Sequence, residues 1–480
     1  MTTFVPSNLL NPQDRRLIAM VCVVQCVVVA MPALWSVYYV PLISGLLLSA
    51  GAMVFSVKRC LVVILVSTVA LPTPLLEFLR IPFGFKLTEV LLIVTFLFLT
   101  IDIVFVRNLR LTRTRGDTLV LLFIILTLLS ALVGIYYGND VKGSIVRNLR
   151  YPLYYLAFFI ATQALDPRDG ARLVAPLLIL SGLAVGMQYI LEFLGAIDLS
   201  MGERFFRVVR RQGIVLPIAL LLIANCFIHS PKRFGRLLLV LAFLPIGLAF
   251  ALTVGRGMWV AFAVGLIATL WLRHRGLPVR QRRAWRAVVF ATVVFSTLVG
   301  SVLLFQRVTG AAITAHAVER SRTFVDYTRD VQVLGRLMGY SEALKEISER
   351  PIVGSGQGKT LDFYSFNPDN SQFETWNAWT VDSLFLTLWL KMGIVGLIVF
   401  VLLCVRLLLD ALRQFNVATD PDTRFFSAGT FSVLVAMMVL GIADGSMING
   451  RFAIVFAILF GAMVRTNVAP PNRISDEIAG

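Results

Sequence analysis

Apolar runs long enough to cross a lipid bilayer recur along most of the sequence. A helix needs about 20 mainly apolar residues to span a hydrocarbon core of about 30 Å. The backbone polar groups of such a run find no water in lipid, so a helix must satisfy them within the segment. Hydrophobic residues make up 58% of the chain, far more than in a soluble domain. The sequence therefore predicts an all-α polytopic membrane protein, with one membrane domain over residues 1–480.

Charged and proline-containing breaks divide the apolar sequence into about fourteen expected spans. They fall near residues 17–34, 38–57, 60–76, 87–106, 118–135, 151–165, 173–194, 213–229, 237–253, 257–272, 287–305, 382–409, 425–443 and 452–464. Prolines lie between residues 32 and 41 and between residues 72 and 82. The alternative interpretation is that the segments there are kinked or re-entrant. In that case the chain has about twelve spans.

Lysine and arginine concentrate in the short loops on the side of the N-terminus, with about 24 there and about 11 on the other side. By the positive-inside rule both termini are cytoplasmic. The net charge of +17 is thus assigned to cytoplasmic loops. Nucleic acid is not an expected partner, since the loops lack the basic–aromatic modules of nucleic-acid binders. The five cysteines form no disulfide or metal-binding pattern. The polar tail, 468–480, is expected to be disordered in the cytoplasm.

One long polar segment, 306–381, interrupts the apolar sequence. In the orientation above it lies outside the cytoplasm, as one large periplasmic loop. Any chemistry that the chain performs is expected at this loop and at the helix ends beneath it.

Several arginines fall near the expected outer ends of the spans. They are Arg147, Arg150, Arg204, Arg207, Arg210, Arg211, Arg256 and Arg451. A single arginine at this depth is typical of a side chain reaching for lipid headgroups. The set favours a phosphate-bearing ligand, because the planar guanidinium binds phosphate and stays charged in a low dielectric. Arg256 is the strongest candidate, since Gly255 and Gly257 on either side let backbone approach a ligand closely.

Three stretches together resemble a known family. They are LTVGRGMWVAFAVGLIATLWL (252–272), GRLMGYSEALKEISERPIVGSGQG (335–358) and VDSLFLTLWLKMGIVGLI (381–398). Their order and spacing, over roughly residues 204–398, are similar to those of the O-antigen ligase and polysaccharide polymerase superfamily of bacterial inner membranes. The resemblance implies a GT-C-like glycosyltransferase that transfers an oligosaccharide from undecaprenyl pyrophosphate, with no cofactor, metal or nucleotide sugar. Membrane lipids, a flippase and a chain-length regulator are the further partners it implies.

The resemblance also implies roles for individual residues. Arg256 matches the family's basic arginine, and a second one corresponds to Arg210 or Arg211. Ligases of the family carry histidine eleven residues before the first glycine of Gly-x-x-Gly, where this chain has Asp382, followed by Ser383. Polymerases often have aspartate there, which favours the polymerase branch.

Asp382 is the expected general base, since an attacking hydroxyl must lose a proton. The alternative is that Asp382 only caps the helix that follows it. His316, the one histidine in the loop, is the fallback base. Further residues are expected to bind substrate: Arg147, Arg150, Arg207, Arg336, Tyr340, Trp376, Trp379 and Arg451.

Two loop motifs have competing interpretations. Trp376 and Trp379 suit stacking on acceptor sugar rings, or alternatively an interfacial aromatic belt. The glycine-rich GSGQGK (354–359) could cradle phosphate, but it lacks the spacing of a nucleotide loop. A turn that ends the preceding helix is the favoured interpretation.

The sequence thus favours a repeat-unit polymerase of the inner membrane that acts at the periplasmic face. A ligase that delivers glycan to a lipid or protein acceptor is the sister hypothesis. A flippase or transporter for lipid-linked oligosaccharide is an alternative of another class, and a non-catalytic assembly subunit is a third. A carrier should show mid-span charges and repeated halves, and mid-span charges are few here, without an internal repeat.

Overall fold

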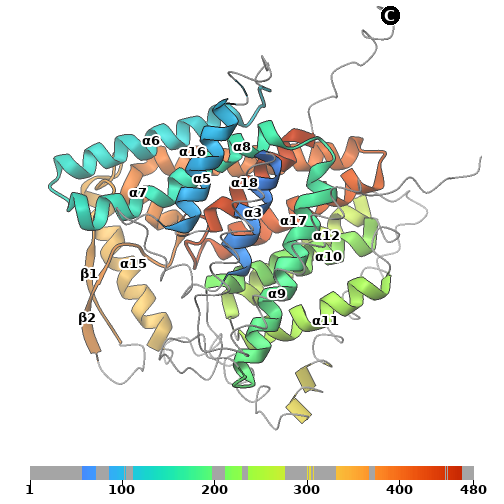
Figure 1. Ribbon diagram of the computed structural model, residues 1–480. Coiled ribbons are helices and arrows are strands. Elements are labelled where there is room, and N and C mark those ends of the chain that lie inside the picture. Colours follow the sequence, from blue (N-terminus) through green and yellow to red (C-terminus); the bar gives the residue numbers. More distant parts are fainter. Residues whose placement is uncertain are drawn as a thin grey trace, which may run out of the picture.

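The computed structural model describes residues 57–71, 86–101, 103, 112–196, 211–229, 236–253, 255–275, 300, 302–303, 306–307, 331–366, 373–448, 450 and 452–466. This part of the chain is mostly helical, as predicted (Figure 1). Its main helices are α3 (Val57–Ala70), α5 (Leu87–Ile101), α6 (Asp117–Tyr136), α7 (Val146–Leu153), α8 (Ala157–Ala164), α9 (Ala175–Phe193), α10 (Val215–His229), α11 (Arg236–Leu252), α12 (Arg256–Arg275), α15 (Val331–Glu349), α16 (Leu384–Val417), α17 (Pro421–Leu440) and α18 (Phe452–Thr466).

Within the described residues, six helical segments are long and apolar enough to cross a membrane. They are Asp117–Tyr136, Gly170–Phe193, Gln212–His229, Arg256–Arg275, Leu384–Val417 and Pro421–Leu440. Shorter apolar helices lie at Thr88–Thr100, Leu237–Leu252 and Phe452–Thr466. The expected spans 17–34 and 38–57 lie outside the described residues apart from Val57, and 287–305 lies largely outside them. The expected span 151–165 is broken near Pro152, where α7 gives way to a turn of 3₁₀ helix before α8.

The helices pack around one large apolar core, whose centre is α10 and α18. Every residue of α10 from Val215 to Cys226 is buried, as is every residue of α18 from Phe452 to Val464. By contrast, α6 exposes a series of aliphatic side chains along its length, including Leu121, Leu128 and Leu132. A helix that is apolar all round, with one side uncovered by protein, is what a lipid environment requires.

The helices run between two ends of the bundle. At one end, Lys58 at the start of α3 binds Asp169 at 2.7 Å. At the other end, Gln188 Nε2 donates to the carbonyl of Ala70 at 2.8 Å. We call this second end the loop face, because residues 331–382 attach there (left in Figure 1).

The described part of the long loop folds into a helix and a β-hairpin. Strand β1 (Leu361–Phe366) pairs antiparallel with β2 (Phe373–Ala378), with Phe363 opposite Trp376. The hairpin lies beside α15 (Figure 1), and a small core that includes Ala343, Leu361 and Leu390 joins both to α16. This hairpin departs from the expected all-α fold. Both strands contain aromatic residues, which are enriched in β-strands.

Candidate functional site

A break in α16 provides the attachment point for the loop. Gly393 has φ 66° and ψ −176°, which interrupts the helical ladder. Loop and helix then exchange backbone hydrogen bonds across the break. Ile394 N donates to Pro351 O at 2.9 Å, and Ser355 N donates to Leu390 O at 2.7 Å. A carbonyl and an amide that the helix leaves free are thus satisfied by the loop.

The glycine-rich segment 354–358 docks on α6. Gln357 N donates to Ser130 O at 2.9 Å, and Asn139 Nδ2 donates to the carbonyls of Ser355 and Gln357, both at 3.0 Å. A Cβ added to Gly356 would collide with the backbone of Gly134. These amides therefore serve packing and donate to protein carbonyls, in keeping with the turn interpretation rather than a phosphate cradle.

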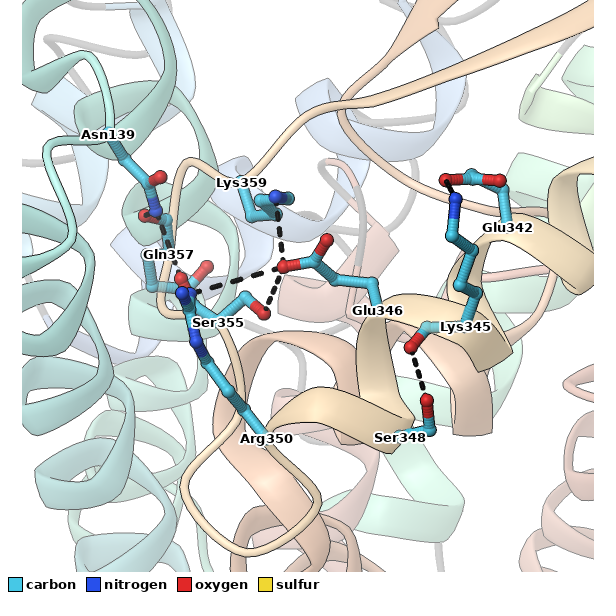
Figure 2. Close-up of polar contacts among 9 residues, drawn as sticks. All are labelled: Asn139, Glu342, Lys345, Glu346, Ser348, Arg350, Ser355, Gln357 and Lys359. Atoms are coloured by element: carbon cyan, nitrogen blue, oxygen red, sulfur yellow. Dashed lines mark hydrogen bonds and ion pairs between the residues drawn. The ribbon is translucent and has the colours of Figure 1, made fainter.

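A polar cluster around Glu346 holds this segment to α15, as Figure 2 shows. The carboxylate accepts from Lys359 Nζ at 2.9 Å and from Ser355 Oγ at 2.9 Å. Burial alone would raise the pKa of Glu346, but the hydrogen bonds from Lys359 and Ser355 lower it below its ordinary value. The Lys359 ammonium is therefore paired with Glu346. Beside this pair, the Arg350 guanidinium lies 3.8 Å from the centre of the Tyr137 ring.

Asp382 lies where the loop enters α16. Its Oδ2 is 2.9 Å from Nε of Arg336 on α15, and its carbonyl accepts from the hydroxyl of Tyr340 at 2.6 Å. The helix cap is the next residue, Ser383, whose side chain accepts from Leu386 N. The capping alternative for Asp382 is therefore wrong, and its carboxylate instead faces the loop helix. Three expected site residues, Asp382, Arg336 and Tyr340, thus come together.

A second carboxylate stands beside this group. Asp444, in the turn between α17 and α18, accepts from Ser446 N at 2.6 Å. Burial, and after it the nearby charge of Asp382, raises the pKa of Asp444. Burial likewise raises the pKa of Tyr340, although Arg336 opposes this. The sequence alone does not reveal that Asp444 is near Asp382, because 62 residues separate the two positions in the chain.

Arg256 begins α12 at the same end of the bundle. A Cβ on the adjacent Gly257 would lie 3.5 Å from Leu440, at the end of α17. The backbone of the next residue in that turn, Gly441, accepts from Leu384 N at 2.8 Å. The starts of α12 and α16 therefore meet the end of α17, and Arg256 and Asp382 belong to the same face.

A cluster of cations and aromatic rings surrounds Trp379, three residues before Asp382. The Trp379 ring stacks with Tyr151 at 6.1 Å, and the Arg147 guanidinium lies 5.7 Å from the Trp379 ring centre. Lys86 Nζ donates to the Tyr151 hydroxyl at 3.3 Å. Stacked rings with nearby cations can bind both a sugar and an anion. Arg147 and Trp379, expected separately, thus form one cluster.

Lys391 is the buried cation of this cluster, and the sequence did not identify it. Its side chain is inside the protein, with the residue 4% exposed. Its Nζ donates to Asn148 Oδ1 at 2.6 Å and lies 5.8 Å from the Trp379 ring centre. Among the described residues, Lys391 forms no ion pair. A buried ammonium without a counter-charge is costly, so an anionic ligand would be favourable beside it.

Arg150 stands at the edge of the cluster and is partly neutralised. Its Nη1 lies 3.4 Å from Oε1 of Glu89, an oxygen that also accepts from the Tyr154 hydroxyl at 2.8 Å. Arg147 and Arg150, three residues apart on α7, therefore differ. Arg147 is exposed and faces an aromatic ring, whereas Arg150 is held by a buried carboxylate.

Trp376 does not join these groups, since it lies on β2, exposed, in register with Phe363. Arg211 begins the turn of 3₁₀ helix before α10. Five expected residues lie outside the described part of the chain: Arg204, Arg207, Arg210, His316 and Arg451. In the described ranges, no group of three or more histidine, cysteine or acidic residues is placed to hold a metal ion.

Part of this chain, which includes residues of the loop face, is similar to a known protein family. No curated protein matches the chain. Residues 237–401 match a family model described as O-antigen ligase. This range runs from α11 through Arg256 and the loop to the broken helix α16. This similarity over residues 237–401 supports the resemblance to the O-antigen ligase and polysaccharide polymerase superfamily that the sequence motifs indicated.

Proposed function

We propose that the protein is a polysaccharide repeat-unit polymerase of the bacterial inner membrane. It transfers an undecaprenyl-pyrophosphate-linked oligosaccharide to the hydroxyl of an acceptor sugar at the periplasmic face. The observation that carries the proposal is the pairing of two groups on one short segment. Asp382, a carboxylate held by Arg336, is three residues from Trp379, which lies among the cations Arg147 and Lys391.

The two groups match the two demands of the reaction. The acceptor oxygen attacks the anomeric carbon of the donor, and the bond from that carbon to the diphosphate oxygen breaks. The diphosphate departs with the bonding electrons and is stabilised by cations. The acceptor proton passes to the carboxylate of Asp382, which acts as general base. Arg336 orients that carboxylate through a 2.9 Å contact.

The leaving group explains why this chemistry needs cations more than an acid. A diphosphate carries its own negative charge away, so the transition state gains most from fixed positive charge. Arg147, Lys391 and Lys86 supply that charge around Trp379 and Tyr151. Arg256, at the start of α12 on the same face, is a further contact for the diphosphate. In this proposal no metal ion is required, and the helices form a GT-C-like scaffold.

The test uses purified protein and lipid extract that contains undecaprenyl-pyrophosphate-linked repeat units, with no other acceptor. A polymerase produces a ladder of products on a gel, and Asp382→Asn abolishes it. Transfer that occurs only after a separate lipid or protein acceptor is added would identify a ligase, and the polymerase proposal would then fail. The presence of aspartate rather than histidine at position 382 is what favours the polymerase.

A further inference from the structure

A polar cavity lies at the end of the bundle opposite the loop face. It has a volume of ≈ 340 Å³ and is lined by residues of the segment before α6, of the end of α16, and by Val464 of α18. Three of the lining residues are arginines: Arg113, Arg115 and Arg413. The cavity therefore gathers cations from two segments that are 300 residues apart in the chain.

Among the described residues, the arginines that line this cavity outnumber the carboxylates. Arg113 and Arg115 are exposed, and neither makes an ion pair with any described residue. Asp410 is buried and is the one carboxylate among the described residues that line the cavity. It lies 3.2 Å from Arg406 and 3.9 Å from Arg413. Because two arginines already share Asp410, the cavity keeps a net positive charge.

The polar atoms suit a phosphate group. Arginine donates through a planar fork that matches phosphate oxygens. Thr114 and Gln414 also line the cavity, and such groups can hydrogen-bond phosphate or glycerol oxygens. Thr114 N is already occupied by Asp117 Oδ2 at 2.7 Å, which fixes the segment on which Arg113 and Arg115 lie.

The helices that lead away from the cavity indicate that the phosphate belongs to a lipid. α6 and α16 pack against each other, and both have aliphatic side chains exposed on the protein surface along their length. Leu121 and Ile125 are exposed on α6, at 51% and 43%, and Leu409 and Leu402 on α16, at 43% and 50%. Acyl chains can cover these side chains while a headgroup occupies the arginine cavity.

We propose that this cavity binds the phosphate headgroup of an anionic membrane lipid, with its acyl chains along α6 and α16. The site is separate from the loop face and does not depend on the proposed transferase activity. It also goes beyond the general excess of arginine on one side of a membrane protein, because three arginines from two distant segments line one cavity.

The experiment measures lipid binding by the full-length protein in detergent, by native mass spectrometry with added phosphatidylglycerol. The test variant is Arg113→Gln with Arg115→Gln. Both side chains are exposed and form no ion pair with a described residue, so the variant loses no such contact. The matched control is Arg168→Gln, an exposed arginine at the same end of the bundle that does not line the cavity. Melting temperature and gel filtration check that both variants fold.

Wild-type protein should bind phosphatidylglycerol more tightly than phosphatidylcholine. The double variant should bind it about 30-fold more weakly, since each arginine at an anionic lipid surface contributes about fivefold. Arg168→Gln should bind within about twofold of wild type. Equal binding by wild type and the double variant would overturn the proposal. Displacement of the lipid by about 1 mM inorganic phosphate would assign the site to a soluble phosphate compound instead.

Discussion

Nε of Arg336 lies 2.9 Å from Oδ2 of Asp382 and joins the helix of the long loop to the entry of a membrane-spanning helix. The two side chains are 43% and 61% exposed. An ion pair this open to water contributes at most about 1 kcal/mol to stability. Its energetic value is thus small, while its geometry fixes a carboxylate at the edge of the membrane domain. This favours a functional role for the pair over a structural one.

Asp382→Asn should abolish polymer formation without loss of stability. Removal of a general base costs about 10²–10⁴-fold in rate, whereas the loss of an exposed ion pair should leave the melting temperature almost unchanged. The measurement is the initial rate of ladder formation per amount of folded protein. Asp362→Asn is the control, because Asp362 is an exposed loop carboxylate, bonded to Asn377 Nδ2 at 2.7 Å. If both variants keep full activity, Asp382 is not the base.

The two tryptophans of the loop should differ in their effects. Trp379 stacks with Tyr151 and lies beside Arg147 and Lys391, whereas Trp376 lies on the exposed hairpin. Trp379→Ala should raise KM for the lipid-linked donor by about fivefold, because a stacked aromatic contact contributes about 1 kcal/mol. Trp376→Ala should change it by less. Equal effects in steady-state kinetics would mean that the cluster around Trp379 is not the donor site.

Gly393→Ala should detach the loop from α16. Gly393 has a positive φ, and an added Cβ would collide with the carbonyl of Ile352. Gly138 also has a positive φ, but an added Cβ there meets nothing within 4 Å. Gly138→Ala should therefore cost only the backbone strain of about 1 kcal/mol, and Gly393→Ala several times more. Limited proteolysis of the loop in detergent measures this. Equal susceptibility of the two variants would contradict the tight approach at Gly393.

The attachment of the loop should weaken in acid. The folded pKa of Glu346 lies below its ordinary value, so its contribution to stability is present above an ordinary carboxyl pKa of about 4.5 and is lost as pH falls through the lowered value. The melting temperature of wild type minus that of Glu346→Gln should therefore shrink between about pH 7 and pH 3. Glu342→Gln, which removes the more exposed pair with Lys345 at 3.5 Å, should show a smaller trend. A difference that stays constant with pH would exclude this linkage.

The membrane class, the long loop and several site residues could be predicted because each depends on local pattern. Apolar runs reveal spans, and the family motifs mark Arg256 and Asp382. The β-hairpin is not predicted from the sequence, because its register depends on pairing between two segments that neither segment reveals alone. Its aromatic residues are the available signal, but aromatic side chains also suit sugar contacts or an interfacial belt.

The remaining site residues depend on packing between distant segments. Asp382 and Ser383 are both good helix caps by sequence, and only the fold shows that Ser383 takes the role. Lys391 is a single charge within an apolar run of the sequence. Lys391 donates to Asn148, which lies 243 residues earlier in the sequence, and no local pattern reveals this contact. A charged residue near the end of a span, next to a glycine that can break the helix, was the signal that could have found it.

Lys391→Met should separate stability from activity. Methionine fills a similar volume, and replacement of a buried charge by an apolar group is often neutral or stabilising. The loss of the hydrogen bond to Asn148 costs about 1–3 kcal/mol, but removal of the buried charge offsets that cost, so the melting temperature should change little. If Lys391 binds the departing diphosphate, the rate of transfer should fall about 10²-fold or more. Lys345→Met, at an exposed lysine of α15, should leave the rate unchanged. A variant that loses stability but keeps its rate per folded molecule would make Lys391 a structural residue only.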